Sequence, residues 1–214
     1  MENRDYSPAD HLLINLDQAL RTLLGKPLVT ERPNPARDLP EAELEAREKD
    51  HIGRLMRINH TGEVCAQALY QGQALTARDP KVRASMEASA REENDHLDWC
   101  ERRARELETG TSLLNPLWYA GSFALGAVAG VAGDKWSLGF VAETEHQVES
   151  HLDSHLAEVP EKDQRTRAIL EQMRDDEIEH GQKARRLGGA ELPKPIKGAM
   201  QLMSKVMTAT VYRM

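Results

Sequence analysis

Four glutamate–histidine pairs with a spacing of three residues stand out because this pattern can bind a metal ion. The pairs are Glu48/His51, Glu93/His96, Glu143/His146 and Glu177/His180. In an α-helix this spacing places the carboxylate and the imidazole on neighbouring turns of one face, within reach of a single cation. With 22 Glu and 8 His among 214 residues, chance alone gives about one such pair. A further criterion must therefore choose among the four.

The polarity of the helix face separates two pairs from the others. Glu93 and His96 interrupt an apolar stripe, and so do Glu177 and His180. An ionised carboxylate buried without a partner is costly, so each of these glutamates must be ion-paired, protonated or bound to a cation. These two pairs are therefore the candidates for a metal site.

The other two pairs are set aside. The Glu143 pair shares its face with Ser150 and Ser154, which predicts that it faces solvent. The Glu48 pair has a rival partner in Asp17, but the prolines between them disfavour a matched helical hairpin.

Two further glutamates are expected at the same height as the chosen pairs. Glu63 precedes Glu93 by 30 residues and Glu145 precedes Glu177 by 32, with a proline-marked turn inside each interval. At a rise of about 1.5 Å per residue, all four carboxylates lie roughly 20–25 Å from the ends of their hairpins. Each half of the chain therefore repeats one pattern, a glutamate followed by Glu-x-x-His.

Four carboxylates and two imidazoles from four helices match the ligand set of ferritin-like di-iron and di-manganese proteins. Two divalent cations would neutralise the four carboxylates. Oxygen and nitrogen donors without sulfur favour iron or manganese, and we expect two iron ions bridged by Glu93 and Glu177. The predicted ligands are Glu63, Glu93, His96, Glu145, Glu177 and His180. The alternative is a set of buried Glu–His hydrogen bonds without metal.

Helical segments that position these residues can be read from prolines, glycines and capping residues. We expect helices at 8–24, 41–77, 80–108, 137–158 and 161–187, with a proline-rich linker after the first. The fold class is therefore all-α, a ferritin-like four-helix bundle of two hairpins. Residues 1–40 would form an N-terminal helix and linker, and residues 41–214 the di-iron domain.

An apolar crossover, residues 109–133, joins the two hairpins with 25 residues and no charge. Its length suits a membrane span, but a single crossing would place the hairpins on opposite sides of the bilayer. We expect it to lie in the membrane interface, to re-enter, or to pack on the bundle, with burial in an oligomer as the alternative. Gly126 and Gly130 favour close helix packing in each case.

The C-terminal tail, residues 193–214, is predicted to be a basic amphipathic helix. Lys194, Lys197, Lys205 and Arg213 give it a charge of +4, whereas the whole chain carries −7. Such a helix is typical of a membrane-surface or partner-docking element, and packing on the bundle is the alternative. The acidic balance argues against nucleic-acid binding, and two cysteines provide no disulfide framework.

Weaker candidates surround the predicted ligands. His151 and His155 follow Glu145 at a distance that suits orientation of ligands or proton transfer, although most such histidines are ordinary polar residues. Asn59 and Tyr70 lie on the face of Glu63, where hydrogen bonds between helices are the alternative explanation.

Two short runs accompany the six predicted ligands: residues 59–64 read NHTGEV and residues 70–73 read YQGQ. With these runs and all six ligand positions, the chain closely resembles the bacterial demethoxyubiquinone hydroxylases of ubiquinone synthesis from Ile52 to the C-terminus. The resemblance implies a di-iron monooxygenase that uses O2 to hydroxylate the ring of 2-polyprenyl-3-methyl-6-methoxy-1,4-benzoquinol, with the six residues as iron ligands. It also implies that His151 lies near the site.

The resemblance further implies a peripheral protein on the cytoplasmic side of the cell membrane. Other ubiquinone-synthesis proteins are expected partners, and we expect a homo-oligomer. Two other functions are compatible with a similar helical bundle: that of a ferritin-like ferroxidase or peroxidase, and that of a non-catalytic quinone carrier. The uncharged crossover argues against the first, and the intact ligand set argues against the second.

Overall fold

The computed structural model describes residues 8–24, 27–30 and 32–214, so the first seven residues of the predicted N-terminal segment lie outside it. Over this part of the chain there are helices and no strands. The helices are α1 (Pro8–Leu23), α2 (Ala46–Thr76), α3 (Pro80–Glu106), α4 (Asn115–Val131), α5 (Asp134–Glu158), α6 (Gln164–Arg186) and α7 (Lys194–Val211).

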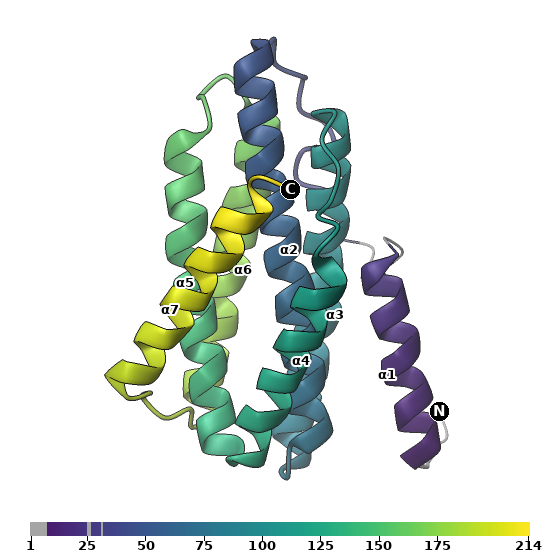
Figure 1. Ribbon diagram of the computed structural model, residues 1–214, viewed down its shortest axis with the longest axis vertical. Helices are drawn as coiled ribbons and strands as arrows, with labels where there is room; N and C mark the ends of the chain where they lie inside the picture. The colour runs from purple at the N-terminus through teal and green to yellow at the C-terminus, as the bar shows by residue number, and fades with distance from the viewer. Residues whose placement is uncertain (1–7, 25–26, 31) are drawn as a thin grey trace.

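Helices α2, α3, α5 and α6 form the bundle, with α2 packed on α3 and α5 packed on α6 (Figure 1). Helix α4 runs along α2 and connects the two hairpins, while α1 lies beside the bundle and α7 crosses it diagonally (Figure 1). The prediction of an all-α ferritin-like four-helix bundle is confirmed. Two hairpins joined by a long crossover bring the middles of four helices to one level.

Local capping explains where the bundle helices begin. Asp79 caps α3, its side chain accepting from the Lys81 amide at 2.8 Å, and Pro80 takes the first helical position. The Asp163 side chain caps α6 by accepting from the Thr166 amide at 3.1 Å. These caps fix the height at which each returning helix presents its ligands.

Three predicted helix starts were wrong. Helix α6 begins at Gln164 rather than at residue 161, because Asp163 caps it. Helix α2 begins at Ala46 rather than at residue 41, because Glu45 and Glu48 form a capping box and the Glu41 side chain instead binds Arg103 at 2.7 Å. Helix α5 begins at Asp134, earlier than the expected 137, after Gly133 with a φ of 111°.

The crossover packs on the bundle, one of the arrangements predicted for it. A Cβ added at Gly126 would lie 2.3 Å from the Leu69 carbonyl oxygen, and one at Gly72 would lie 2.3 Å from that of Phe123. A Cβ added at Gly130 would collide with the side-chain hydroxyl of Thr76. Glycine therefore permits α2 and α4 to approach closely along their length. Within the described residues, no helix combines the length and the apolar character needed to cross a bilayer.

Candidate metal centre

The six predicted ligands lie together in the middle of the bundle, and all six are buried. Donor atoms of Glu63, Glu93, His96 and Glu177 lie within 4.8 Å of one another. Donor atoms of Glu145, Glu177 and His180 form a second such group. Glu177 belongs to both groups, so the two sets of donors are adjacent and have one residue in common.

Glu93 and Glu177 each reach both imidazoles with separate oxygens. One Glu93 oxygen lies 3.1 Å from His96 Nδ1 and the other lies 3.1 Å from His180 Nδ1. The two Glu177 oxygens lie 3.4 Å and 3.3 Å from the same two nitrogens. A carboxylate that spans two imidazoles with one oxygen each could bridge two cations.

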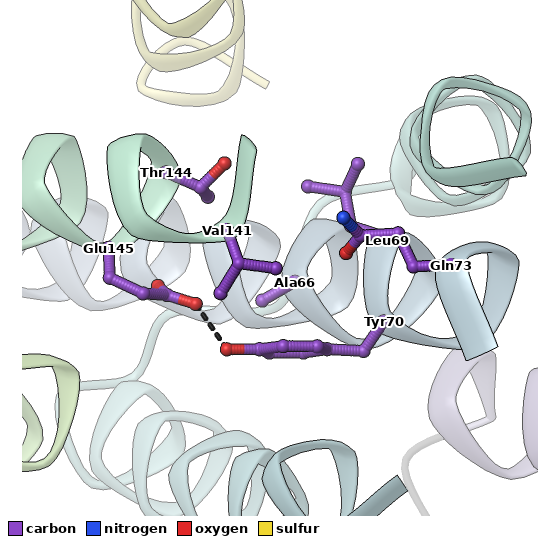
Figure 2. Close-up of a pocket in the computed structure, with 7 residues that line it drawn as sticks. All are labelled: Ala66, Leu69, Tyr70, Gln73, Val141, Thr144 and Glu145. Carbon is purple, nitrogen blue, oxygen red and sulfur yellow. Dashed lines mark hydrogen bonds between the residues drawn. The ribbon is translucent and has the colours of Figure 1, made fainter. Parts of the chain in front are cut away.

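Glu63 and Glu145 occupy the two ends of the cluster. Glu63 lies 3.6 Å from His96 Nδ1, on the α3 side. Glu145 accepts a hydrogen bond from the Tyr70 hydroxyl, which points across from α2 to α5 (Figure 2). The second Glu145 oxygen, Oε2, is buried and has no hydrogen-bond partner among the described residues. The bond joins two helices and also reaches a predicted ligand, so it agrees with both explanations offered for Tyr70.

A cavity of about 10 Å³ lies beside Glu145, between α2 and α5 (Figure 2). Its lining is Ala66, Leu69, Tyr70, Gln73, Val141, Thr144 and Glu145. The volume is close to that needed for one water molecule, and most of the wall is apolar.

Burial, together with neighbouring charges, shifts the pKa values of Glu63, Glu93 and Glu145 in the cluster. Burial, with the charges of Glu93 and Glu177, raises the pKa of Glu63 and that of Glu145 well above the usual range. Burial opposes ionisation of Glu93 as well, but the charges of His96 and His180 hold its pKa well below the usual range.

The two imidazoles are also strongly affected. Burial opposes their protonation, yet the surrounding carboxylates raise the pKa of His96 and of His180 well above the usual value. The cluster therefore retains protons that cations can displace.

The outer nitrogen of each imidazole binds a carboxylate from the opposite hairpin. His96 Nε2 lies 2.9 Å from Asp176 on α6, and His180 Nε2 lies 2.6 Å from Glu92 on α3. These two acids were not predicted from the sequence. The pattern that could have identified them is that each directly precedes the glutamate of a Glu-x-x-His motif. Carboxylates in this position fix the tautomer and orientation of metal-binding histidines.

His151 lies away from these contacts. Its ring contacts that of His155 with centroids 4.0 Å apart and the planes inclined by 59°. Its Nε2 is buried without a hydrogen-bond partner in the described part of the chain. Burial, together with the charges of His151 and His51, lowers the pKa of His155 to about 2. No hydrogen bond or ion pair between the described residues joins His151 to the six predicted ligands. Its role in orienting ligands or transferring protons stays a prediction.

The two rejected pairs lie outside the cluster, but the reason given for one of them was wrong. Glu143 is buried, whereas it was predicted to face solvent, because Lys197 of α7 binds it at 2.9 Å. Its partner His146 is exposed, as predicted for that face. Glu48 caps α2 and binds Lys162, and its partner His51 binds Tyr212 of the tail at 2.8 Å.

Comparison with solved structures places the fold in the ferritin-like class. The bacterioferritin-related dodecameric thioferritin of Bacteroides fragilis superposes with a TM-score of 0.55, covering 67% of this chain and 85% of that one at 19% sequence identity. A buried Glu–His cluster within four facing helices is typical of the carboxylate-ligated members of this class.

The family follows from the sequence matches. The family model described as ubiquinone biosynthesis protein COQ7 matches residues 50–211, so the chain belongs to this family. A protein of Alcanivorax borkumensis is 59% identical, with 100% of both chains covered. Another, from Cupriavidus metallidurans, is 60% identical over 95% of this chain and 99% of its own length. Both relatives are named 3-demethoxyubiquinol 3-hydroxylase.

Proposed function

We propose that this chain is a 3-demethoxyubiquinol 3-hydroxylase, a di-iron monooxygenase that uses O2 to hydroxylate the ring of a polyprenyl methoxy-benzoquinol. The single observation that carries the proposal is the bridging arrangement of Glu93 and Glu177 between His96 and His180. The near full-length relatives with the hydroxylase name support the substrate and the reaction.

The residues fit a pair of iron ions. The donors are carboxylate oxygens and imidazole nitrogens, and no cysteine belongs to either group. Glu145 Oε2 is a buried acceptor without a partner in the described residues, as expected of a ligand atom. Glu93 and Glu177 would bridge the ions, Glu63 and Glu145 would be terminal, and His96 and His180 would each bind one ion.

Bound iron would supply the activation of O2, with one oxygen atom entering the ring and the other leaving as water after uptake of two electrons from a donor. The protein's own contribution is to hold the ligands in a site closed to bulk water. Tyr70 donates to Glu145 and so keeps one carboxylate oxygen fixed while the other is free to bind. Asp176 and Glu92 hold the outer imidazole protons and leave both Nδ1 atoms directed at the cluster.

A single-turnover reaction tests the proposal. Protein loaded anaerobically with ferrous iron and mixed with the methoxy-benzoquinol and ¹⁸O2 should give a product that carries one ¹⁸O atom, detected by mass spectrometry. Glu177→Ala should give none, whereas Glu179→Ala, an exposed glutamate in the same motif, should react normally. Oxygen consumption without hydroxylation would instead support a ferroxidase or peroxidase, and absence of both would support a quinone carrier.

We also propose that the protein is peripheral on the cytoplasmic side of the cell membrane. Large apolar side chains are exposed on α4, where Leu117 is 66% exposed, and on α7, where Leu202 is 64% exposed and Val206 52%. Both helices lie in the foreground of Figure 1. The exposed Lys194, Lys205 and Arg213 of the tail would attract anionic lipid headgroups while the apolar side chains enter the interface.

Flotation with vesicles that contain phosphatidylglycerol tests this second proposal. The double variant Leu202→Glu/Val206→Glu should lose vesicle binding, whereas Gln201→Glu, an exposed polar position on the same helix, should retain most of it. Equal binding by both variants would contradict a membrane role for α7. The homo-oligomer and the partnership with other ubiquinone-synthesis proteins stay predictions.

A further inference from the structure

The two imidazoles of the cluster differ in how their outer carboxylates are held. Asp176, the partner of His96, has a side chain only 14% exposed. Glu92, the partner of His180, has a side chain 41% exposed. One contact that distinguishes them comes from the segment that follows α1: its Arg32 forms an ion pair with Asp176, and no ion pair joins the described residues of this segment to Glu92.

Arg32 makes this difference. Its Nη1 lies 2.9 Å from the Asp176 oxygen that binds His96, and its Nη2 lies 3.5 Å from His96 Nε2. Its Nε donates to Asp95 at 2.9 Å, and its guanidinium carbon lies 5.1 Å from the centre of the Trp99 ring. One side chain thus spans α3 and α6 at the point where they support His96.

The linker itself is fastened at the same place. The Thr30 amide donates to the buried Asp95 carboxylate at 2.7 Å, and the Thr30 hydroxyl donates to its other oxygen. Asn94 donates to the Leu28 carbonyl at 3.0 Å. Arg32 is therefore held by contacts with both α3 and α6. Glu92 forms no ion pair with an arginine or lysine among the described residues; its pKa is lowered mainly by the hydrogen bond with His180, with smaller contributions from the more distant charges of Lys183 and Arg32.

We propose that Arg32 is a positioning residue that acts through Asp176 to fix the His96 imidazole, so that the two iron sites are inequivalent. The inference rests on the proposed metal centre. The His96 imidazole would be held in one orientation and would release its ion slowly, whereas the His180 imidazole, whose outer carboxylate is 41% exposed, would exchange its ion more readily. Carboxylate partners of metal-bound histidines typically change metal affinity by about 10–100-fold.

A first experiment needs no metal. In protein labelled with ¹⁵N-histidine, the ring N–H that His96 donates to Asp176 should exchange with solvent more slowly than the one that His180 donates to Glu92. Arg32→Gln should accelerate exchange at His96 alone, and Arg32→Lys should restore part of the protection. Arg37→Gln, an exposed arginine of the same linker, should change neither rate. Unchanged exchange at His96 in Arg32→Gln would overturn the proposal.

A second experiment follows release of ferrous iron to a chelator under anaerobic conditions, without substrate. The wild-type protein should release two ions at different rates. Asp176→Asn should accelerate the slower release by roughly tenfold or more, and Arg32→Gln should accelerate the same phase by less. Glu92→Gln should affect only the faster phase.

The double variant Arg32→Gln/Asp176→Asn separates an action through Asp176 from a general loss of structure. If Arg32 acts through Asp176, the double variant should release iron no faster than Asp176→Asn alone. Multiplying effects, or equal acceleration of both ions by Arg32→Gln, would overturn the proposal. A protein that binds no iron pair would refute the proposed function, while the ring-exchange measurement would still decide the role of Arg32.

Discussion

The α2–α3 hairpin and the α5–α6 hairpin supply the same set of predicted ligands but surround them differently. Each gives one glutamate from its first helix and a Glu-x-x-His pair from its second. In the first half, His96 is fully buried behind Asp176 and Arg32. In the second half, Glu145 is held by Tyr70 and His180 is held by the half-exposed Glu92. Internal repetition of the ligands therefore does not make the two sites equal.

Loss of a predicted ligand that both iron sites share should have the largest effect, because it weakens both sites at once. Glu177→Ala removes a carboxylate that contacts His96 and His180. We expect iron affinity to fall by more than the roughly 100-fold upper range for an outer partner, and turnover to be abolished. Metal analysis after anaerobic dialysis measures this, with Glu179→Ala as the control. Equal iron content in the two variants would refute the assignment of ligands.

Competition between protons and iron for the predicted ligands should have the next largest effect on iron affinity, and it should affect both sites. The pKa values of His96, His180, Glu63 and Glu145 are all raised, so these groups keep their protons to higher pH than usual. Iron must displace those protons, so iron affinity should rise with pH and fall in acid, by about tenfold per pH unit for each proton displaced. Calorimetric titration in buffers with different heats of ionisation counts the protons. A pH-independent affinity would contradict the account.

Loss of the Tyr70 hydroxyl should affect mainly the second half. Tyr70→Phe removes the hydrogen bond to Glu145 and leaves a buried carboxyl oxygen without a donor. We expect the free energy of unfolding of the metal-free protein to fall by about 1–3 kcal/mol, and one ion to bind more weakly. Tyr119→Phe is a matched control, since its hydroxyl donates to Gln71 away from the ligands. Denaturant titration should show destabilisation in both, and metal titration a weaker ion only in Tyr70→Phe.

Disturbance of the crossover should affect the metal centre least. In Gly126→Ala the new Cβ meets the Leu69 carbonyl, so we expect the free energy of unfolding to fall by about 1–3 kcal/mol. In Gly121→Ala the Cβ meets no atom within 4 Å, and removal of a helix-interior glycine should stabilise the protein by about 0.5–1 kcal/mol. Both variants should bind a full complement of iron. Weaker iron binding by Gly126→Ala would show that the crossover helps to shape the site.

The bundle and the six candidate ligands were predictable because both depend on local spacing. Prolines and capping residues mark the hairpin turns, and a helix rises by a constant amount per residue, so equal distances from a turn imply equal heights. The apolar stripes around Glu93 and Glu177 then identify the carboxylates that face the core.

The outer partners and the tail contacts were not predictable in the same way. Glu92 meets His180 only because α3 crosses α6 at one level, and Arg32 reaches Asp176 from a linker without regular structure. Glu143 was expected to face solvent because its own helix face is polar, but Lys197 of α7 binds it. Contacts between distant segments depend on packing that no local pattern records.

The central claim is that two metal ions share Glu93 and Glu177 between His96 and His180. X-ray absorption spectroscopy of anaerobically iron-loaded protein tests it most directly. The account predicts two irons per chain, an iron–iron scattering path, and a ligand sphere of oxygen and nitrogen with one imidazole per iron. A single iron without a neighbouring iron, or sulfur in the ligand sphere, would contradict it.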